Sequence, residues 1–243
     1  MIITIQGNIG SGKSSFVAML KQQYQNNPHI IFVDEPVTTW LQITDKEGEN
    51  ILSKFYKNKQ KYAFSFQMVA YITRLSKLRE AVRSNAYIVI TERDLLCDRN
   101  VFAQMLYDDG DIEPIEFEIY KKWFDEFNQE VQTAHHIYIK TDTPITYERV
   151  NKRSRPEEVG HIPFEYLNRC SEYHTRWLSN LSNTLILDGN PNKTVIHDYA
   201  SWFIQFEKIA KQYLTNDEYK EVFHNPKFRR NVSFEDIQHL TTW

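Results

Sequence analysis

The chain has 243 residues, 41% of them hydrophobic and 14% aromatic, which is enough to bury the core of one substantial domain. Its 29 Lys and Arg against 32 Asp and Glu give a net charge of −3, and this lack of basic excess argues against a nucleic acid partner. No apolar run is long enough to span a membrane, and two cysteines without a C-x-x-C spacing suggest neither disulfides nor a zinc site. We therefore expect one cytoplasmic domain over residues 1–215, with residues 216–243 as a C-terminal appendage of uncertain structure.

The first expected element is an apolar strand over Ile2–Gln6, and a complete phosphate-binding loop follows it. Glycines there let backbone N–H groups point at a β-phosphate, while Lys13 reaches the β/γ oxygens and the Ser14 hydroxyl is placed to ligate Mg²⁺. The motif predicts binding of ATP, or another nucleoside triphosphate, together with Mg²⁺. The loop residues are Gly7, Asn8, Ile9, Gly10, Ser11, Gly12, Lys13, Ser14 and Ser15.

Further apolar, β-branched segments alternate with helical patterns along the chain, which is typical of a parallel sheet wrapped by helices. Helices are expected after the phosphate loop, over roughly residues 50–83, around residues 101–106 and over residues 117–131. The sequence thus predicts an α/β, P-loop NTPase-type three-layer fold with a five-stranded parallel sheet flanked by helices. The four further strands are expected at Ile30–Val33, Tyr87–Thr91, Ile137–Lys140 and Thr184–Leu187.

Polar residues follow the second and third strands at their carboxyl ends. Glu35 lies just past the second strand, before Pro36, and Glu92 with Arg93 follows the third. Because ligands of open α/β sheets lie beyond the carboxyl ends of the strands, these side chains are expected to converge on the phosphate loop in one crevice. Glu35 is interpreted either as a solvated strand-end carboxylate or helix cap, or as a base that accepts the proton of an attacking hydroxyl.

Glu92 follows a Walker-B-like strand, so its carboxylate is expected to face the metal held by Ser14. Arg93 suits a phosphate or substrate oxygens, since its planar fork donates hydrogen bonds in pairs. The alternative interpretation of Glu92 and Arg93 is a surface ion pair.

In the long expected helix, Gln67, Ala70 and Arg74 fall along one stripe beside an apolar stripe. One interpretation is an ordinary amphipathic boundary. The other is a pocket wall in which the Gln67 amide pairs with a nucleobase and Asp98 holds Arg74.

A basic cluster at Arg149, Lys152, Arg153 and Arg155 is expected to be either a solvated helix face or a mobile lid. In a lid, its arginines would stabilise charge on a transferred phosphoryl group. His135 and His136 show no metal spacing and are taken as structural.

Taken together, these motifs make the chain resemble the deoxyribonucleoside kinase family, in its deoxycytidine and deoxyguanosine kinase branch. The resemblance covers most of the expected catalytic body. It rests on Gly7 to Ser15, Asp34-Glu35-Pro36-Val37 through Trp40, Phe64-x-Phe66-Gln67, Thr91-Glu92-Arg93, Asp98-Arg99 and the Arg149 to Tyr166 lid region.

The resemblance implies either a catalytic or a binding role for each matching residue. Glu35 would be the base for a sugar 5′-hydroxyl, and Arg93 would support that oxygen and the phosphate. Lys13 would be the third catalytic residue, at the β/γ oxygens of the triphosphate. Ser14 and Glu92 would serve Mg²⁺. The remaining implied residues are Tyr56 and Glu158 at the sugar 3′-hydroxyl, Gln67 at the base, Trp40, Phe66 and Phe102 lining the pocket, and Arg149, Arg153 and Arg155 at the phosphates.

Base preference is implied by Ala70, Arg74 and Asp98, because thymidine-accepting members of the family have a bulkier residue, a methionine and a small residue there. Deoxycytidine or a purine deoxynucleoside is therefore expected over thymidine, and the family also implies a homodimer joined by helices. Asp94 stands where the family usually has serine, and it is expected to add a negative charge close to the phosphates.

Two other functions remain open from the residues. A catalytically silent nucleotide-binding subunit can use the same fold, although it would be expected to lack the loop or the base. A nucleoside monophosphate kinase also combines a phosphate loop with arginines, but it would need further cations for the acceptor phosphate. Neither the preferred acceptor nor the phosphate donor is settled by the sequence.

Overall fold

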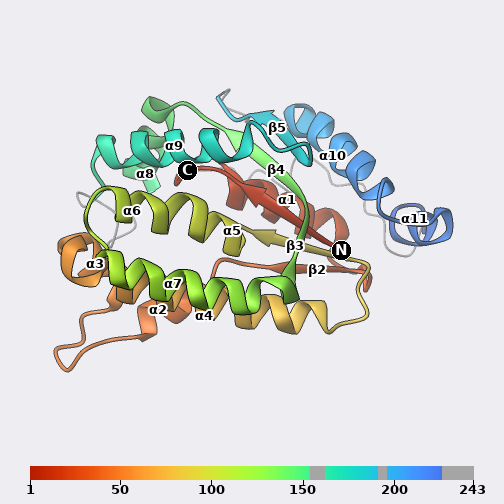
Figure 1. Ribbon diagram of the computed structural model, residues 1–243. Helices are drawn as coiled ribbons and strands as arrows, with labels where there is room; N and C mark the ends of the chain where they lie inside the picture. Colours follow the sequence, from red (N-terminus) through yellow and green to blue (C-terminus); the bar gives the residue numbers. More distant parts are fainter. Residues whose placement is uncertain (154–161, 191–195, 226–243) are drawn as a thin grey trace.

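The computed structural model describes residues 1–153, 162–190 and 196–225, and a five-stranded, all-parallel sheet runs through its middle (Figure 1). The strand order is β2-β3-β1-β4-β5, so the three strands that precede the phosphate loop, Glu35 and Arg93 are consecutive neighbours. This confirms the predicted α/β fold. The strands are β1 (Ile2–Gln6), β2 (Ile30–Val33), β3 (Ile88–Glu92), β4 (Thr133–Lys140) and β5 (Thr184–Asp188).

Helices cover both faces of the sheet (Figure 1). They are α1 (Lys13–Tyr24), α2 (Val37–Gln42), α3 (Ile51–Lys57), α4 (Lys59–Val82), α5 (Leu95–Cys97), α6 (Gln104–Asp108), α7 (Pro114–Phe127), α8 (Thr143–Arg153), α9 (Phe164–Leu178), α10 (Ile196–Lys211) and α11 (Asn216–Phe223), with a π-helical segment η1 (Asp98–Ala103) and a 3₁₀ turn η2 (Asn128–Val131).

Alternation along the strands divides the core between the two faces of the sheet. Ile3 and Ile5 of β1 face one side, where they pack with residues of α1, α10 and α11. Ile2 of β1 and Val89 of β3 face the other side, where they pack with α4 and α7. β1 and β3 are buried at every residue and have mostly apolar sequences, which is why their positions were predictable.

The long helix expected over residues 50–83 is in fact two helices, α3 and α4. Asn58 separates them, with φ −149° and ψ 83°, and its side chain accepts a hydrogen bond from the Lys61 N–H. An asparagine that caps the next helix competes with continuation of the preceding one, so the prediction of one helix was wrong at this residue.

The helical segment expected around residues 101–106 is confirmed, but its first half is π-helical. It runs from α5 through η1 into α6 without a break. The wider π turn occurs mostly as short bulges that are frequent at functional sites. Here it carries Asp98, Val101 and Phe102.

Part of the segment expected as a peripheral appendage is packed against the body of the protein. Thr215 and Glu218 form a capping box that starts α11. Val222 and Phe223 of this helix are buried, in the same cluster as α1 and α10. Residues 226–243 lie outside the described part of the chain.

Among the helices that the structure describes, none combines the length and apolar character needed to cross a lipid bilayer.

Candidate active site

A cavity of about 280 Å³ is lined by residues from the phosphate loop and from the chain just beyond β2 and β3. It brings together seventeen of the residues singled out from the sequence. These are Ile9, Gly10, Gly12, Lys13, Ser14, Glu35, Trp40, Tyr56, Phe66, Gln67, Ala70, Arg74, Glu92, Arg93, Asp98, Phe102 and Arg153.

The phosphate loop has the backbone shape that its glycines were expected to permit. Gly10 and Gly12 have φ angles of 77° and 99°, and a Cβ on Gly10 would lie 2.7 Å from the Thr146 carbonyl oxygen. A larger residue is therefore excluded at Gly10 both by conformation and by space. The other four loop residues do not line the cavity: Gly7, Asn8, Ser11 and Ser15.

Lys13 lies at the start of α1 and is buried. Its ammonium donates to the Asn8 carbonyl over 2.7 Å and lies 3.8 Å from Glu92 Oε1. Burial lowers the pKa of Lys13 to about 8, and the charge of Arg93 adds to that effect. An anionic ligand at the loop would favour the charged form, so the site is built to receive phosphate oxygens.

The two oxygen groups expected at a metal lie next to each other. Ser14 Oγ donates to Glu92 Oε1 over 2.9 Å, at the end of β3. A hydroxyl and a carboxylate are ligands that Mg²⁺ prefers, and Mg²⁺ at nucleotides is commonly held by one or two protein groups plus phosphates. Among the described residues no cluster of three or more His, Cys, Asp or Glu forms a further metal site. The donor set therefore fits Mg²⁺ bound together with a triphosphate.

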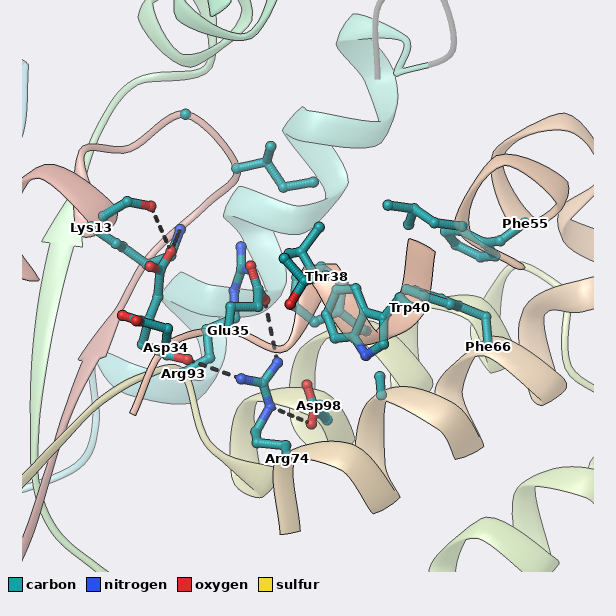
Figure 2. Close-up of a pocket in the computed structure, with 18 of the residues that line it drawn as sticks. Lys13, Asp34, Glu35, Thr38, Trp40, Phe55, Phe66, Arg74, Arg93 and Asp98 are labelled. Carbon is teal, nitrogen blue, oxygen red and sulfur yellow. Dashed lines mark hydrogen bonds and ion pairs between the residues drawn. The ribbon is translucent and has the colours of Figure 1, made fainter. Parts of the chain in front are cut away.

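Glu35 is held by two arginines in the middle of the cavity (Figure 2). Arg93 Nη1 donates to Glu35 Oε1 over 2.6 Å, and Arg74 Nη2 reaches the same oxygen over 3.2 Å. Burial alone would raise the pKa of Glu35, but the charges of Arg93 and Arg74 outweigh it and bring the pKa to about 2. Glu35 is thus an ionised carboxylate at neutral pH, and its two arginine contacts exclude a solvated strand-end carboxylate. No side-chain cap hydrogen bond is present at the start of α2, so Glu35 does not act as a helix cap there.

Arg93 is buried, which excludes a surface ion pair. Besides Glu35, it donates through Nη2 to the Gly7 carbonyl over 3.4 Å, and its guanidinium lies over the Phe102 ring. Its Nε is buried without a hydrogen-bond partner. A buried donor left without a partner is costly, so Arg93 is poised to donate to a bound group.

Arg74 is held as predicted, and by more than Asp98. Its Nε donates to Asp98 Oδ2 over 2.9 Å, and its Nη1 donates to the Glu92 carbonyl over 2.9 Å. Gln67 lies on the same helix, almost fully buried, and its Oε1 has no hydrogen-bond partner. An unpaired acceptor beside a fixed Arg–Asp pair offers directional contacts to a planar polar ligand.

Aromatic rings line the side of the cavity that lies across from Lys13 (Figure 2). Trp40 meets Phe66 edge to face with centroids 5.2 Å apart, and Phe66 stacks on Phe55 at 4.7 Å. The Trp40 indole N–H donates to Thr73 Oγ1 over 3.0 Å, which fixes the ring. The wall is therefore apolar and preformed.

Six lining residues were not predicted as site residues. Leu52 and Phe55 come from α3, and their three-residue spacing with Tyr56 next along the helix was the available signal. The other four are Asp34, Val37, Thr38 and Tyr166.

The arginines of the predicted basic cluster do not all lie at the cavity. Arg153, at the end of α8, lines the cavity, whereas Arg149 donates to the Gly189 carbonyl over 3.1 Å and does not. Arg155 and Glu158 lie outside the described residues.

Asp94 does not face the phosphates, so the expectation of added negative charge there was wrong. Its carboxylate turns away from the cavity, accepts from the Cys97 N–H over 2.8 Å as the cap of α5, and accepts from Gln6 Nε2 over 2.9 Å. These hydrogen bonds draw the side chain into the protein, where it is buried.

Comparison with known proteins places the site in a family. The family model described as deoxynucleoside kinase matches residues 3–224. A fowlpox virus (strain NVSL) protein named as a probable deoxycytidine kinase is 35% identical over 180 residues, covering 73% of this chain and 71% of that protein. Human deoxycytidine kinase is 32% identical over 200 residues, covering 72% and 74%. Deoxycytidine kinase 2 of Gallus gallus is 31% identical over 239 residues, covering 88% of each chain.

The fold and the cavity thus define an ATP-dependent phosphotransferase of the P-loop type. The chain belongs to the deoxynucleoside kinase family.

Proposed function

We propose that this chain transfers the γ-phosphoryl group of ATP to the 5′-hydroxyl of a deoxyribonucleoside, as a step of nucleotide salvage. One observation carries the proposal. The Glu35 carboxylate stands in a single cavity with the phosphate loop on one side and the Gln67, Arg74 and Asp98 side chains on the other. This arrangement suits a nucleoside whose hydroxyl meets Glu35 while its base lies on α4.

Glu35 would act by orienting the hydroxyl and taking its proton late in the reaction. With a pKa of about 2, it is too weak a base to deprotonate an alcohol beforehand. Phosphoryl transfer through a loose transition state does not need early deprotonation, because little bonding to the nucleophile has formed. Arg93 would donate from its unpartnered Nε to the same oxygen or to the transferred group, while Lys13 holds the phosphates.

Ser14 and Glu92 would hold Mg²⁺, which neutralises charge on the triphosphate when bound. Tyr56 lines the cavity and would bind the sugar 3′-hydroxyl together with Glu158, as the family resemblance implies. Arg153 would face the phosphates, with Arg149 and Arg155 as further lid arginines.

Deoxycytidine or a purine deoxynucleoside is proposed as the acceptor over thymidine. The fixed Arg74–Asp98 pair and the unpaired Gln67 Oε1 present a defined set of donors and acceptors, and a base that left one unpaired would lose about 1–3 kcal/mol. The relatives named as deoxycytidine kinases support testing deoxycytidine first.

A homodimer is proposed through the outer surface of α4 and α7. Ile115, Ile119 and Trp123 recur every four residues on α7 and are 64%, 42% and 45% exposed, and Ile72 of α4 is 46% exposed. Contiguous apolar side chains on a helix surface mark an association surface. A cytoplasmic location is proposed from the composition and from two cysteines that are both free and buried.

The test is a set of initial rates with ATP and Mg²⁺ on deoxycytidine, deoxyadenosine, deoxyguanosine, thymidine and deoxycytidine monophosphate. We expect phosphorylation of deoxycytidine or a purine deoxynucleoside, a lower rate with thymidine, and no turnover of the monophosphate. Hydrolysis of ATP that no nucleoside stimulates would reject the proposal, as would preference for the monophosphate.

A further inference from the structure

The backbone of Arg93 is held in an unusual conformation. Its φ of 61° makes it the one non-glycine residue with a left-handed φ among the residues that the structure describes. A Cβ disfavours this conformation, so it persists only where the surroundings impose it. The chain bends at Arg93 directly after β3, and the guanidinium donates to Glu35.

Two hydrogen bonds to the backbone of Arg93 hold the turn. The Arg93 N–H donates to the Ile5 carbonyl over 3.1 Å, and Thr91 Oγ1 donates to the Arg93 carbonyl over 2.9 Å. The first contact fixes the entry into the turn, and the second holds the carbonyl that leads into Asp94. Asp94 then connects the turn to α5.

The Asp94 carboxylate joins three elements of the fold. Oδ1 accepts from the N–H of Cys97, the third residue of α5, and from Gln6 Nε2 at the end of β1, over 2.8 and 2.9 Å. Oδ2 accepts from Thr133 Oγ1 at the start of β4 over 2.6 Å, with His136 Nδ1 3.8 Å away. The side chain is 2% exposed, so water does not replace these bonds.

These partners are connected to the reacting groups. Gln6 immediately precedes Gly7, whose carbonyl accepts from Arg93 Nη2 over 3.4 Å. Cys97 immediately precedes Asp98, which holds Arg74. One carboxylate therefore ties the end of β1 that leads into the phosphate loop to the helix start that follows Arg93.

We propose that Asp94 is a positioning residue for phosphoryl transfer: by joining Gln6, Thr133 and the start of α5, its carboxylate fixes the left-handed turn that aims the Arg93 guanidinium at Glu35. A serine at this position retains the helix cap but cannot reach Gln6 and Thr133 together, because it has one oxygen on a shorter side chain. The inference rests on the proposed role of Arg93.

The experiment compares Asp94→Ser, Asp94→Asn and wild type by kcat, by KM for ATP and for the best deoxynucleoside, and by thermal unfolding. We expect Asp94→Ser to lower kcat about tenfold with both KM values changed less than about threefold, because misplacement of a catalytic group acts on the transition state. Asp94→Asn should recover kcat to within about threefold of wild type, because its amide oxygen accepts from Cys97 and Gln6 while its nitrogen meets the Thr133 hydroxyl.

Thr215→Ala is the matched control, because it removes a helix cap of similar kind from α11, away from the cavity. It should lower the unfolding temperature and leave kcat unchanged. If Asp94→Ser does not fold, Thr133→Val is measured in its place. This variant deletes one hydrogen-bond donor to Asp94 and should lower kcat about twofold to threefold.

The positioning role is overturned if kcat of the folded Asp94→Ser protein stays within about twofold of wild type, or, where Asp94→Ser does not fold, if Thr133→Val keeps wild-type kcat. It is also overturned if Asp94→Asn falls as far as Asp94→Ser. These outcomes leave the proposed function standing, since they are ratios to an active wild type. A wild-type chain that phosphorylates no deoxynucleoside would overturn the function, and the positioning role with it.

Discussion

Arg74 donates to Glu35 over 3.2 Å while its Nε is paired with Asp98 over 2.9 Å. The side chain proposed to present hydrogen bonds to the base thus also touches the carboxylate proposed to receive the hydroxyl proton. Base selection and catalysis share one guanidinium, so changes at Arg74 are expected to affect both.

The first prediction concerns the stability of the Arg74–Asp98 pair. Arg74→Met leaves a buried carboxylate without its cation, and we expect a loss of about 3–5 kcal/mol in the free energy of unfolding, measured with urea. The double variant Arg74→Met, Asp98→Ala should recover much of that loss and accept thymidine better than wild type does. Arg79→Met, which breaks the exposed pair with Glu130, is the control and should cost far less. Equal losses for the two single variants would contradict the prediction.

The second prediction concerns the reacting carboxylate. Glu35→Gln should lower kcat by about 10²-fold or more, because the amide accepts no proton, while ATP binding stays intact. Steady-state rates and ATP titration calorimetry measure the two quantities. Glu118→Gln, on the exposed side of α7, should behave like wild type. A Glu35→Gln protein with full turnover would remove Glu35 from the mechanism.

The third prediction concerns the metal. Chelation with EDTA should abolish turnover, and added Mg²⁺ should restore it. Glu92→Gln should raise the Mg²⁺ concentration needed for half-maximal rate, because a neutral amide replaces one of the two oxygen groups at that position. An unchanged Mg²⁺ dependence in Glu92→Gln would show that this carboxylate does not serve the metal.

The fourth prediction concerns stability against pH. Burial lowers the pKa of His174 to about 3, helped by the charge of Arg93. Below about pH 6.5 His174 is protonated in the unfolded chain but stays neutral in the folded chain. The free energy of unfolding therefore falls as the pH drops, by about 1–2 kcal/mol at pH 5. His174→Gln should flatten the slope between pH 6.5 and pH 5 in urea unfolding. His135 and His136, whose pKa values burial also lowers, remain in both proteins, so the difference in slope isolates His174.

The fifth prediction concerns association. Trp123→Glu places a charge in the exposed apolar row on α7 and should shift the protein to a monomer. Sedimentation velocity of the variant and of wild type measures the change. Tyr147→Glu, at an exposed aromatic of α8, is the control and should leave the assembly intact. A wild-type chain that is monomeric at micromolar concentration would contradict the proposed homodimer.

The sequence predicted the site well where local patterns decide the structure. Strands buried on both faces can be recognised as short apolar runs in the sequence. Polar residues just past such strands meet at one edge of a parallel sheet. Glu35 and Arg93 were assigned to the candidate site in this way, and Lys13 by the spacing of the phosphate loop. The predicted start of β4 at Ile137 was four residues late, since the strand begins at Thr133. Thr133, His135 and His136 are polar and gave no apolar signal, although they pair with β1.

Other features depend on partners far away in the chain. The direction of the Asp94 side chain is set by Gln6 and Thr133, which are 88 and 39 residues distant, and neither contact has a local signature. Phe55 was missed because a buried aromatic on a short helix reads as ordinary core. The break at Asn58 was missed because the residues on both sides of it favour a helix.

The fixed indole of Trp40 has a consequence for substrate analogues. Because its single N–H is already donated to Thr73, the ring offers a nucleoside an apolar surface and no hydrogen bond. Halogen or alkyl groups that an analogue carries toward this wall would be tolerated or rejected according to their size. Groups on the edge facing Gln67, Arg74 and Asp98 would instead be accepted or rejected according to their pattern of donors and acceptors, so the two edges of one base would follow different rules.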